Sequence, residues 1–461
     1  MFVSFSNTAS HPRAVLSNAN VDSSQPSSSS TLISPCSQSI STNPYGFYLF
    51  RVAGIKYGSM PTITLQELFD PKNGELVASA QFNYMFDVDW LLKQYPKEFR
   101  SRPLLIVHGF SGPEKTAISE PAKKYSNVRQ CAAHIRLPYG SHHTIWMSPK
   151  LVTSTQRPAP DSPTLFRAEL LNYLHGYGSN LTSGKNAPLN SWIEDIETHD
   201  FSPIRVYLVS SVSGNHKGDD LNKFGHAKMK QLIESHVHDV PNSWPLIGQF
   251  SSVGSLGAQP PSWLTTEWSS SLAGRGARGI RLIFPCVNDV RNSLEGYAAG
   301  GCLPYSKKTA ERQPWFRQFL HRWQAGKHSR AVPHIKSYAR VSPDGKQAAW
   351  FLLTSANLSK AAWGSYVKNK TQFMIRSYEL GVLFVPEQFK KGATAFNLRL
   401  PVTNGSESSH TETSNKLHCP NELFPVPYEL PPTPYDSSDE PWLWDVVYPE
   451  PDVYGNSWRP T

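Results

Sequence analysis

Short runs of apolar residues recur along the chain from about Asn43 onward and are separated by polar, turn-forming segments. Runs of this kind, rich in Val, Ile, Leu and Phe, are typical of buried strands. Helical patterns lie between several of them, and this alternation favours an α/β fold in which helices cover mixed sheets. The expected strands are 104–107, 204–209, 280–284, 349–353 and 381–385.

Three segments between these runs repeat apolar residues three and four positions apart, which is the spacing of one helix face. They are 166–175, 226–236 and 315–323. A loop-rich stretch at 212–220 is expected to be a hinge. It would separate an N-terminal half, 45–212, from a C-terminal half, 213–461.

Both ends of the chain differ in composition from these halves. The first 44 residues contain 14 serines and no apolar core of the kind that a secretory signal needs. We expect segment 1–44 to be disordered. Beyond Pro420 the chain is rich in Pro, Tyr and Trp, and this tail is expected to wrap the second half rather than form strands.

Charge and cysteine content narrow the class of protein. The 45 Lys and Arg residues outnumber the 36 Asp and Glu residues, and the net charge of +9 favours polyanionic partners such as DNA. No run approaches the ~18 apolar residues of a membrane span. We therefore expect a soluble, intracellular monomer without metal or cofactor. The five cysteines are far apart and form no metal-ligand cluster: Cys36, Cys131, Cys286, Cys302 and Cys419.

The most informative stretch is His334-Ile335-Lys336, which is followed 21 residues after the lysine by Asn357 in a Ser-Ala-Asn turn. On a strand, His334 and Lys336 would share one face, with Ile335 buried behind them. Lysine offsets charge on the oxygens of a phosphodiester, and histidine can attack phosphorus or protonate the departing oxygen. The amide of Asn357 would add a neutral donor. The pattern indicates a phosphoryl-transfer site that requires no metal.

His-x-Lys also occurs by chance in a chain with 16 histidines, as His226-Ala227-Lys228 shows. That copy lies in a helical pattern, in which residues two apart diverge. Position 249, 21 residues after Lys228, is glutamine rather than asparagine. The second copy is therefore not expected to form a site.

Several longer stretches resemble the tyrosyl-DNA phosphodiesterase family, a branch of the phospholipase D superfamily. The resemblance runs in order from about Asn43 to Pro460 and includes 79–84 (SAQFNY), 248–257 (GQFSSVGSLG), 293–297 (SLEGY), 355–363 and 378–382 (YELGV). It implies two similar α/β halves that face each other across one active site. Each half of such a protein normally supplies a histidine, a lysine and an asparagine.

The resemblance also implies roles for individual residues. His143 is similar to the nucleophile that becomes phosphorylated, and His334 to the general acid that protonates the leaving tyrosine and then activates water. Lys336 and Asn357 resemble the phosphate-binding pair, and Glu379 resembles the carboxylate that orients the second histidine. The residues that match contacts to the DNA strand or peptide are Tyr84, Tyr139, Ser252, Ser255 and Trp444.

The first half departs from the family pattern. His142-His143-Thr144 begins the motif, but position 145 is Ile where the pattern has lysine. The chain then continues with sequence that resembles a family segment beyond the asparagine, so the first-half lysine and asparagine are missing. We expect this half to lack a strand, to be less stable, and to leave an impaired enzyme. A gene model or splice form that lost a segment explains the gap better than divergence to a pseudoenzyme, because both edges still resemble the family.

Three alternative functions compete with this interpretation. The stretch 105–110 (LIVHGF) resembles the strand and turn before an α/β-hydrolase oxyanion hole, but the chain contains no G-x-S-x-G elbow. A lipid-directed phospholipase would have no reason to carry the stretches around Tyr84, Ser252 and Trp444. A catalytically dead DNA-end or DNA–protein-adduct binding protein stays open as an alternative. The favoured interpretation is a nuclear DNA-repair phosphodiesterase that acts on 3′-phosphotyrosyl ends.

Overall fold

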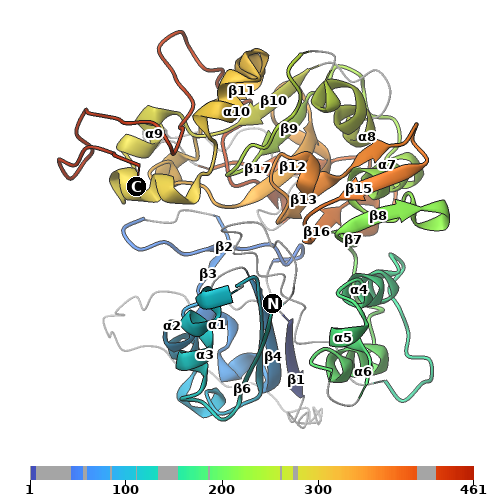
Figure 1. Cartoon of the computed structure of the whole chain (residues 1–461). Helices are drawn as coiled ribbons and strands as arrows, with labels where there is room; N and C mark the ends of the chain where they lie inside the picture. The colour runs from blue at the N-terminus through green and yellow to red at the C-terminus, as the bar shows by residue number, and fades with distance from the viewer. Residues whose placement is uncertain are drawn as a thin grey trace, which may run out of the picture.

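Two mixed sheets of unequal size carry the fold, one formed mainly by the first half of the chain and one mainly by the second (Figure 1). Strand β7 (Tyr207–Ser211) precedes the expected boundary at 212 but belongs to the second sheet. The computed structural model describes residues 2–6, 43–55, 60–83, 86–110, 112–132, 154–184, 187–259, 262–273, 279–401 and 422–460. The α/β architecture expected from the hydrophobic pattern is confirmed. Among the described helices, none is both long enough and apolar enough to cross a membrane.

The sheet of the first half has four strands in the order β1-β4-β5-β6. Strand β4 is parallel to β5 and β5 to β6, whereas β1 is antiparallel to β4. Helices α2 (Val88–Gln94) and α3 (Thr116–Ala122) pack on this sheet through a small core that includes Leu92, Ile106 and Ile118. The strands are β1 (Phe2–Ser6), β4 (Glu75–Asn83), β5 (Leu104–His108) and β6 (Val128–Ala132).

The sheet of the second half has nine strands, and seven of them follow the order β11-β10-β9-β12-β13-β16-β7. Strands β9, β10 and β11 are parallel, and β12 is antiparallel to β9. The seven strands are β7 (Tyr207–Ser211), β9 (Leu246–Gln249), β10 (Ile280–Ile283), β11 (Leu320–His321), β12 (Lys336–Val341), β13 (Gln347–Thr354) and β16 (Glu379–Phe384). The other two are β17 (Phe396–Arg399) and β18 (Phe424–Pro425).

One hydrophobic core joins both sheets. It contains Val107 of β5, Phe351 of β13 and residues of helices α4 and α6. The apolar faces of these helices explain their position, because each face must be covered by another element. The helices that follow β6 or flank the second sheet are α4 (Phe166–His175), α5 (Ser179–Thr182), α6 (Asn190–Thr198), α7 (Gly225–His236), α8 (Ser269–Ala273), α9 (Val287–Arg291), α10 (Lys307–Glu311) and α11 (Lys360–Trp363).

Two segments differ in part from the local expectation. The segment 315–323 is a 3₁₀ helix, Pro314–Phe319, followed by strand β11, because Leu320 and His321 pair with β10. The expected hinge at 212–220 contains strand β8 (Gly214–Lys217), which pairs with β15 (Gln372–Ile375) in a sheet completed by β14 (Ser365–Val367). In both places long-range strand pairing, which the local pattern does not report, decides the conformation.

The two ends of the chain agree only in part with the expected disorder at the N-terminus and the expected wrapping tail at the C-terminus. Residues 7–42 of the serine-rich tail lie outside the described residues, but Phe2–Ser6 form β1 and so depart from the expected disorder. The C-terminal tail lies along the second half, where the Trp442 side chain is fully buried in the core. Strand β18 is the described strand within it.

Candidate active site

Lys336 is the first residue of β12, and its side chain is fully buried. Its Nζ lies 3.5 Å from His334 Nε2 and donates a hydrogen bond of 2.6 Å to the backbone oxygen of His334. The strand begins at Lys336, so His334 and Ile335 lie just before it rather than on it as expected. The two side chains nevertheless meet, and Ile335 packs on the hydrophobic core.

Glu379 enters the site from β16, where it is the first residue. Its side chain is buried, and Ser355 Oγ donates a hydrogen bond of 2.5 Å to Oε2. Ser355 Oγ also accepts the amide of Leu380, which fixes the serine against β16. The other carboxylate oxygen, Oε1, is buried and has no hydrogen-bond partner among the described residues. One carboxylate oxygen of Glu379 is thus hydrogen-bonded to Ser355, and the other can accept a further hydrogen bond.

Burial changes the acidity of both groups. It lowers the pKa of Lys336 to about 7, although the charges of Glu379 and Cys302 act in the opposite direction. It raises the pKa of Glu379 to about 7, against the hydrogen bond from Ser355 and the charge of Lys336. Low polarity disfavours the charged form of each group, and the opposite charge of the partner offsets part of that effect. Both groups therefore titrate near neutral pH.

Asn357 lies in the turn that follows β13, and its amide has a fixed orientation. Its Oδ1 accepts hydrogen bonds from the backbone amide of Ser251 at 3.1 Å and from Ser251 Oγ at 3.2 Å. Because the oxygen is committed to Ser251, the NH₂ group points away from it and can donate to a bound anion.

The loop after β9 packs closely on this turn. Gly254 donates its amide to the backbone oxygen of Leu358 at 2.9 Å. A Cβ at Gly254 would lie 2.6 Å from the Cβ of Ser359, so a side chain does not fit there. The glycine lets the loop that holds Ser251 approach the asparagine turn, and this approach sets the position of Asn357.

The segment 300–305 connects two of the expected substrate contacts. Ser252 Oγ donates to the backbone oxygen of Pro304 at 2.7 Å, and the amide of Trp444 donates to the neighbouring oxygen of Tyr305 at 3.2 Å. Cys302 in the same segment is exposed and lies near enough for its charge to interact with Lys336. Ser252 and Trp444 are therefore brought to one segment beside the lysine. Ser255 is exposed on the loop after β9.

Three aromatic residues connect the site to the first half. The ring of Tyr378, next to Glu379, lies 4.6 Å from that of Tyr177, which in turn lies 5.8 Å from Phe82 of β4. Tyr378 also donates its hydroxyl to the backbone oxygen of Gly176 at 2.7 Å. The first-half sheet thus packs toward the second-half site through the end of α4.

Three of the predicted site residues, Tyr84, Tyr139 and His143, lie outside the described residues. The structure places His334 beside Lys336, with Glu379 close enough for its charge to act on that lysine. Asn357 follows β13, whose last residue, Thr354, pairs with Lys336. Sequence reasoning missed Ser251 and Cys302, and it gave Ser355 no role. Ser355 stands in the quoted Ser-Ala-Asn turn, but its partner Glu379 is 24 positions away and no local spacing points to it.

The second His-x-Lys copy is structural, as expected. His226 is buried on α7, where its Nδ1 lies 3.0 Å from Ser271 Oγ and its Nε2 3.0 Å from Glu267 Oε1. Lys228 pairs with Glu169 of α4 at 2.7 Å. The two side chains serve different contacts, which is the divergence that helical spacing requires.

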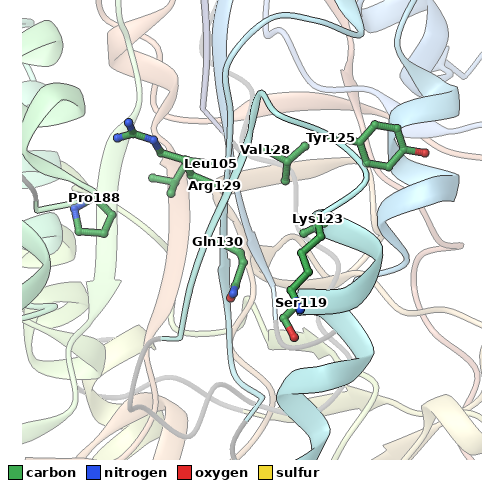
Figure 2. A pocket seen from close by; sticks show the side chains of 9 residues that line it. Leu105, Ser119, Lys123, Tyr125, Val128, Arg129, Gln130 and Pro188 are labelled. Atoms are coloured by element: carbon green, nitrogen blue, oxygen red, sulfur yellow. The ribbon is translucent and has the colours of Figure 1, made fainter.

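A cavity of about 400 Å³ lies in the first half, away from these residues (Figure 2). Side chains from α3 and β6 line it, and Pro188 closes another side; Lys123 at its rim pairs with Glu120 at 2.6 Å. None of the predicted site residues lines it. Among the described residues there is also no group of three or more His, Cys, Asp or Glu side chains that could hold a metal ion.

Comparison with known proteins shows which family the chain resembles. The family model described as tyrosyl-DNA phosphodiesterase matches residues 46–145 and 144–436, two segments that meet at Thr144 and Ile145. The chain is 32% identical over 457 residues to tyrosyl-DNA phosphodiesterase 1 of Drosophila melanogaster, covering 88% of this chain and 74% of that protein. It is 33% identical over 456 residues to tyrosyl-DNA phosphodiesterase 1 of Arabidopsis thaliana, covering 84% and 73%.

A solved structure has the same fold. The crystal structure of the yeast tyrosyl-DNA phosphodiesterase aligns with a TM-score of 0.57 over 83% of this chain and 95% of that one, at 18% identity. The resemblance inferred from the sequence is therefore confirmed by family, relatives and fold. The chain belongs to the tyrosyl-DNA phosphodiesterase family.

Proposed function

We propose that this protein is a DNA-repair phosphodiesterase that hydrolyses 3′-phosphotyrosyl and related 3′ adducts on DNA. The observation that carries the proposal is the buried Lys336 at the start of β12. Its Nζ lies 3.5 Å from Nε2 of the His334 imidazole. A buried cation beside an imidazole is suited to an anionic ester whose leaving group must be protonated. Membership of the family supports the same chemistry.

In the proposed reaction His143 attacks the phosphorus, and the bond from phosphorus to the tyrosine oxygen breaks. His334 gives its proton to that oxygen. A water molecule then gives a proton to His334 and its oxygen attacks the phosphorus, which breaks the phosphorus–nitrogen bond and releases a 3′-phosphate. The two histidines carry out bond making and proton transfer, so the reaction requires no metal.

The other residues stabilise the negative charge of the transition state or orient a catalytic histidine. Lys336 and the NH₂ group of Asn357 would bind the non-bridging oxygens, which gain negative charge in the transition state. Glu379 would orient His334 through the carboxylate oxygen that Ser355 leaves open. It would also favour the protonated imidazole, because a nearby negative charge does so.

DNA binding would use the positive net charge of the chain. Tyr84, Tyr139, Ser252, Ser255 and Trp444 are the proposed contacts to the strand or to the peptide. Location in the nucleus follows from this substrate. We propose that the protein acts on it as a monomer.

The activity of this form would be low. Position 145 is Ile, so the first half supplies neither its lysine nor its asparagine. Each lost transition-state donor costs about 10²–10³-fold in rate, so two losses amount to several orders of magnitude. The same gap favours a second candidate, a protein that binds DNA ends or DNA–protein adducts without cleaving them.

Cleavage of a 3′-phosphotyrosyl oligonucleotide in EDTA distinguishes the two, with His143→Ala and His334→Ala measured beside the unmutated chain. We expect slow, EDTA-resistant cleavage that both substitutions abolish. Tight binding of the same oligonucleotide with no cleavage after long incubation would support the binding protein. Cleavage that survives both substitutions would show that the proposed site is wrong.

A further inference from the structure

The four-stranded sheet of the first half contains a strand from an unexpected part of the chain. In the second half, the parallel strands β11, β10 and β9 are followed by the antiparallel β12, which begins with Lys336. In the first half, the parallel strands β6, β5 and β4 are followed by the antiparallel β1. Strand β1 therefore takes the sheet position that corresponds to β12, yet it consists of Phe2–Ser6 rather than residues that follow His143 (Figure 1).

The edge of β4 that faces β1 needs a partner. Ser79 donates its amide to Pro103 at the start of β5, with a distance of 2.9 Å. Neighbouring residues of a strand direct their amides to opposite edges, so Ala78 and Ala80 face away from β5. Ser4 pairs with Ala78 and Phe2 with Ala80. Without β1, these amides and carbonyls would form an open edge next to a buried part of β4, where unpaired backbone groups are costly.

We propose that Phe2–Ser6 is a surrogate strand: it fills the position left by the missing first-half motif strand and completes the backbone pairing of β4 without supplying catalytic side chains. The segment FVSFS suits this role because it has no charge and is rich in Phe and Val, which favour strands. The pairing stabilises a half that would otherwise present an aggregation-prone edge. The inference rests on sheet topology and does not depend on whether the chain cleaves DNA.

The occupant of the β4 edge is this chain's own segment rather than that of a second copy. Residues 7–42 link β1 covalently to the rest of the same chain, and tethering raises the effective concentration of a segment to about millimolar. A second copy at micromolar concentration cannot compete with that. The segment should therefore pair within one molecule.

Disulfide trapping in the full chain tests the register and the occupant. Ser4→Cys combined with Ala78→Cys places thiols on directly paired residues, whose spacing suits a disulfide. Ser4→Cys with Ser79→Cys is the matched control, because Ser79 pairs with Val3, one residue out of register in the regular part of the pairing, and projects from the opposite face. Peptide mapping after mild oxidation identifies the bond despite the five native cysteines.

We expect the bond between positions 4 and 78 to form within monomers at least about tenfold faster than that of the control. A bond that joins two molecules would show strand exchange and overturn the proposal. So would equal rates for the two pairs, or no bond in folded protein.

If the cysteine variants do not fold, hydrogen exchange of the native sequence decides. Deleting Phe2–Ser6 should speed exchange at Ala78 and Ala80 about tenfold or more while amides of β5 change less, and unchanged exchange at these alanines contradicts the pairing.

Discussion

The two sheets share a frame of three parallel strands and one antiparallel neighbour, but they differ in what that neighbour carries. In the second half the neighbour is β12, which brings Lys336 into the site and leads through β13 to Asn357. In the first half it is β1, whose sequence contains neither His nor Lys. Both sheets contain the three parallel strands, whereas Lys336 comes from the antiparallel neighbour in one sheet alone, so the parallel strands do not by themselves supply this lysine.

The sheets also differ at their outer edges. Next to β11, His321 pairs with Pro434 of the C-terminal tail, and Tyr435 donates its amide to Leu320. Among the described residues no strand pairs with the outer edge of β6. The second half thus has both edges of its parallel strands covered, whereas the first depends on β1 at one edge. We infer that the second half is the more stable partner.

Among the substitutions that test this comparison, Lys336→Ala should have the largest effect. If the second half carries the remaining phosphate cradle, Lys336→Ala should lower kcat/KM by about 10²–10³-fold, because a transition-state donor is lost. The measurement is single-turnover cleavage of a 3′-phosphotyrosyl oligonucleotide. Lys228→Ala is the matched control, since Lys228 belongs to the other His-x-Lys copy and pairs with Glu169 instead. Equal losses in the two variants would contradict the assignment.

A smaller effect is expected on stability, because burying the charges of Lys336 and Glu379 is less favourable than burying well-packed neutral groups of the same size. The double variant Lys336→Met, Glu379→Gln should be inactive but more stable than the native chain at pH 7, by about 1–4 kcal/mol in urea unfolding. This gain should be confined to the second half. If the native chain is instead more stable than the double variant at pH 7, Lys336 and Glu379 together stabilise the fold.

The pH dependence of that difference follows from the two pKa values. Burial raises the pKa of Glu379 from 4.5 to about 7, so its destabilisation of the native chain grows as pH rises through that interval. Burial lowers the pKa of Lys336 from 10.5 to about 7, so its destabilisation is full below about pH 7 and is relieved as pH rises toward 10.5. The stability difference between the variants should therefore be largest near pH 7. A stability difference that does not change with pH would contradict the pKa shifts of Glu379 and Lys336.

The smallest effect is expected at Ser251, which orients Asn357 without touching substrate. Ser251→Ala removes one of two hydrogen bonds to Asn357 Oδ1 and leaves the backbone amide, so kcat/KM should fall by at most about tenfold. Ser342→Ala is the control, because Ser342 is also buried and hydrogen-bonded but lies beyond the far end of β12. It should lower stability without changing cleavage. A loss as large as that of Lys336→Ala would mean that Ser251 binds the substrate directly.

Much of the frame could be predicted because its signals are local. The run at 104–107 became β5, and the apolar spacing at 166–175 became α4 with the same bounds. Predictions failed where a distant strand decided the outcome, as at 315–323, which pairs partly with β10, and at 214–217, which pairs with β15. A pattern within ten residues cannot report a partner found far along the chain.

For the candidate site, the sequence by itself determined the residue types, the 21-residue spacing from Lys336 to Asn357, the family and the gap at Ile145. The tertiary structure decided which groups meet. Ser355 reaches Glu379 and Ser251 reaches Asn357 because β12 lies between β9 and β13, and β16 lies next to β13. It also decided the acidity of Lys336 and Glu379, because desolvation depends on how completely the surrounding elements exclude water.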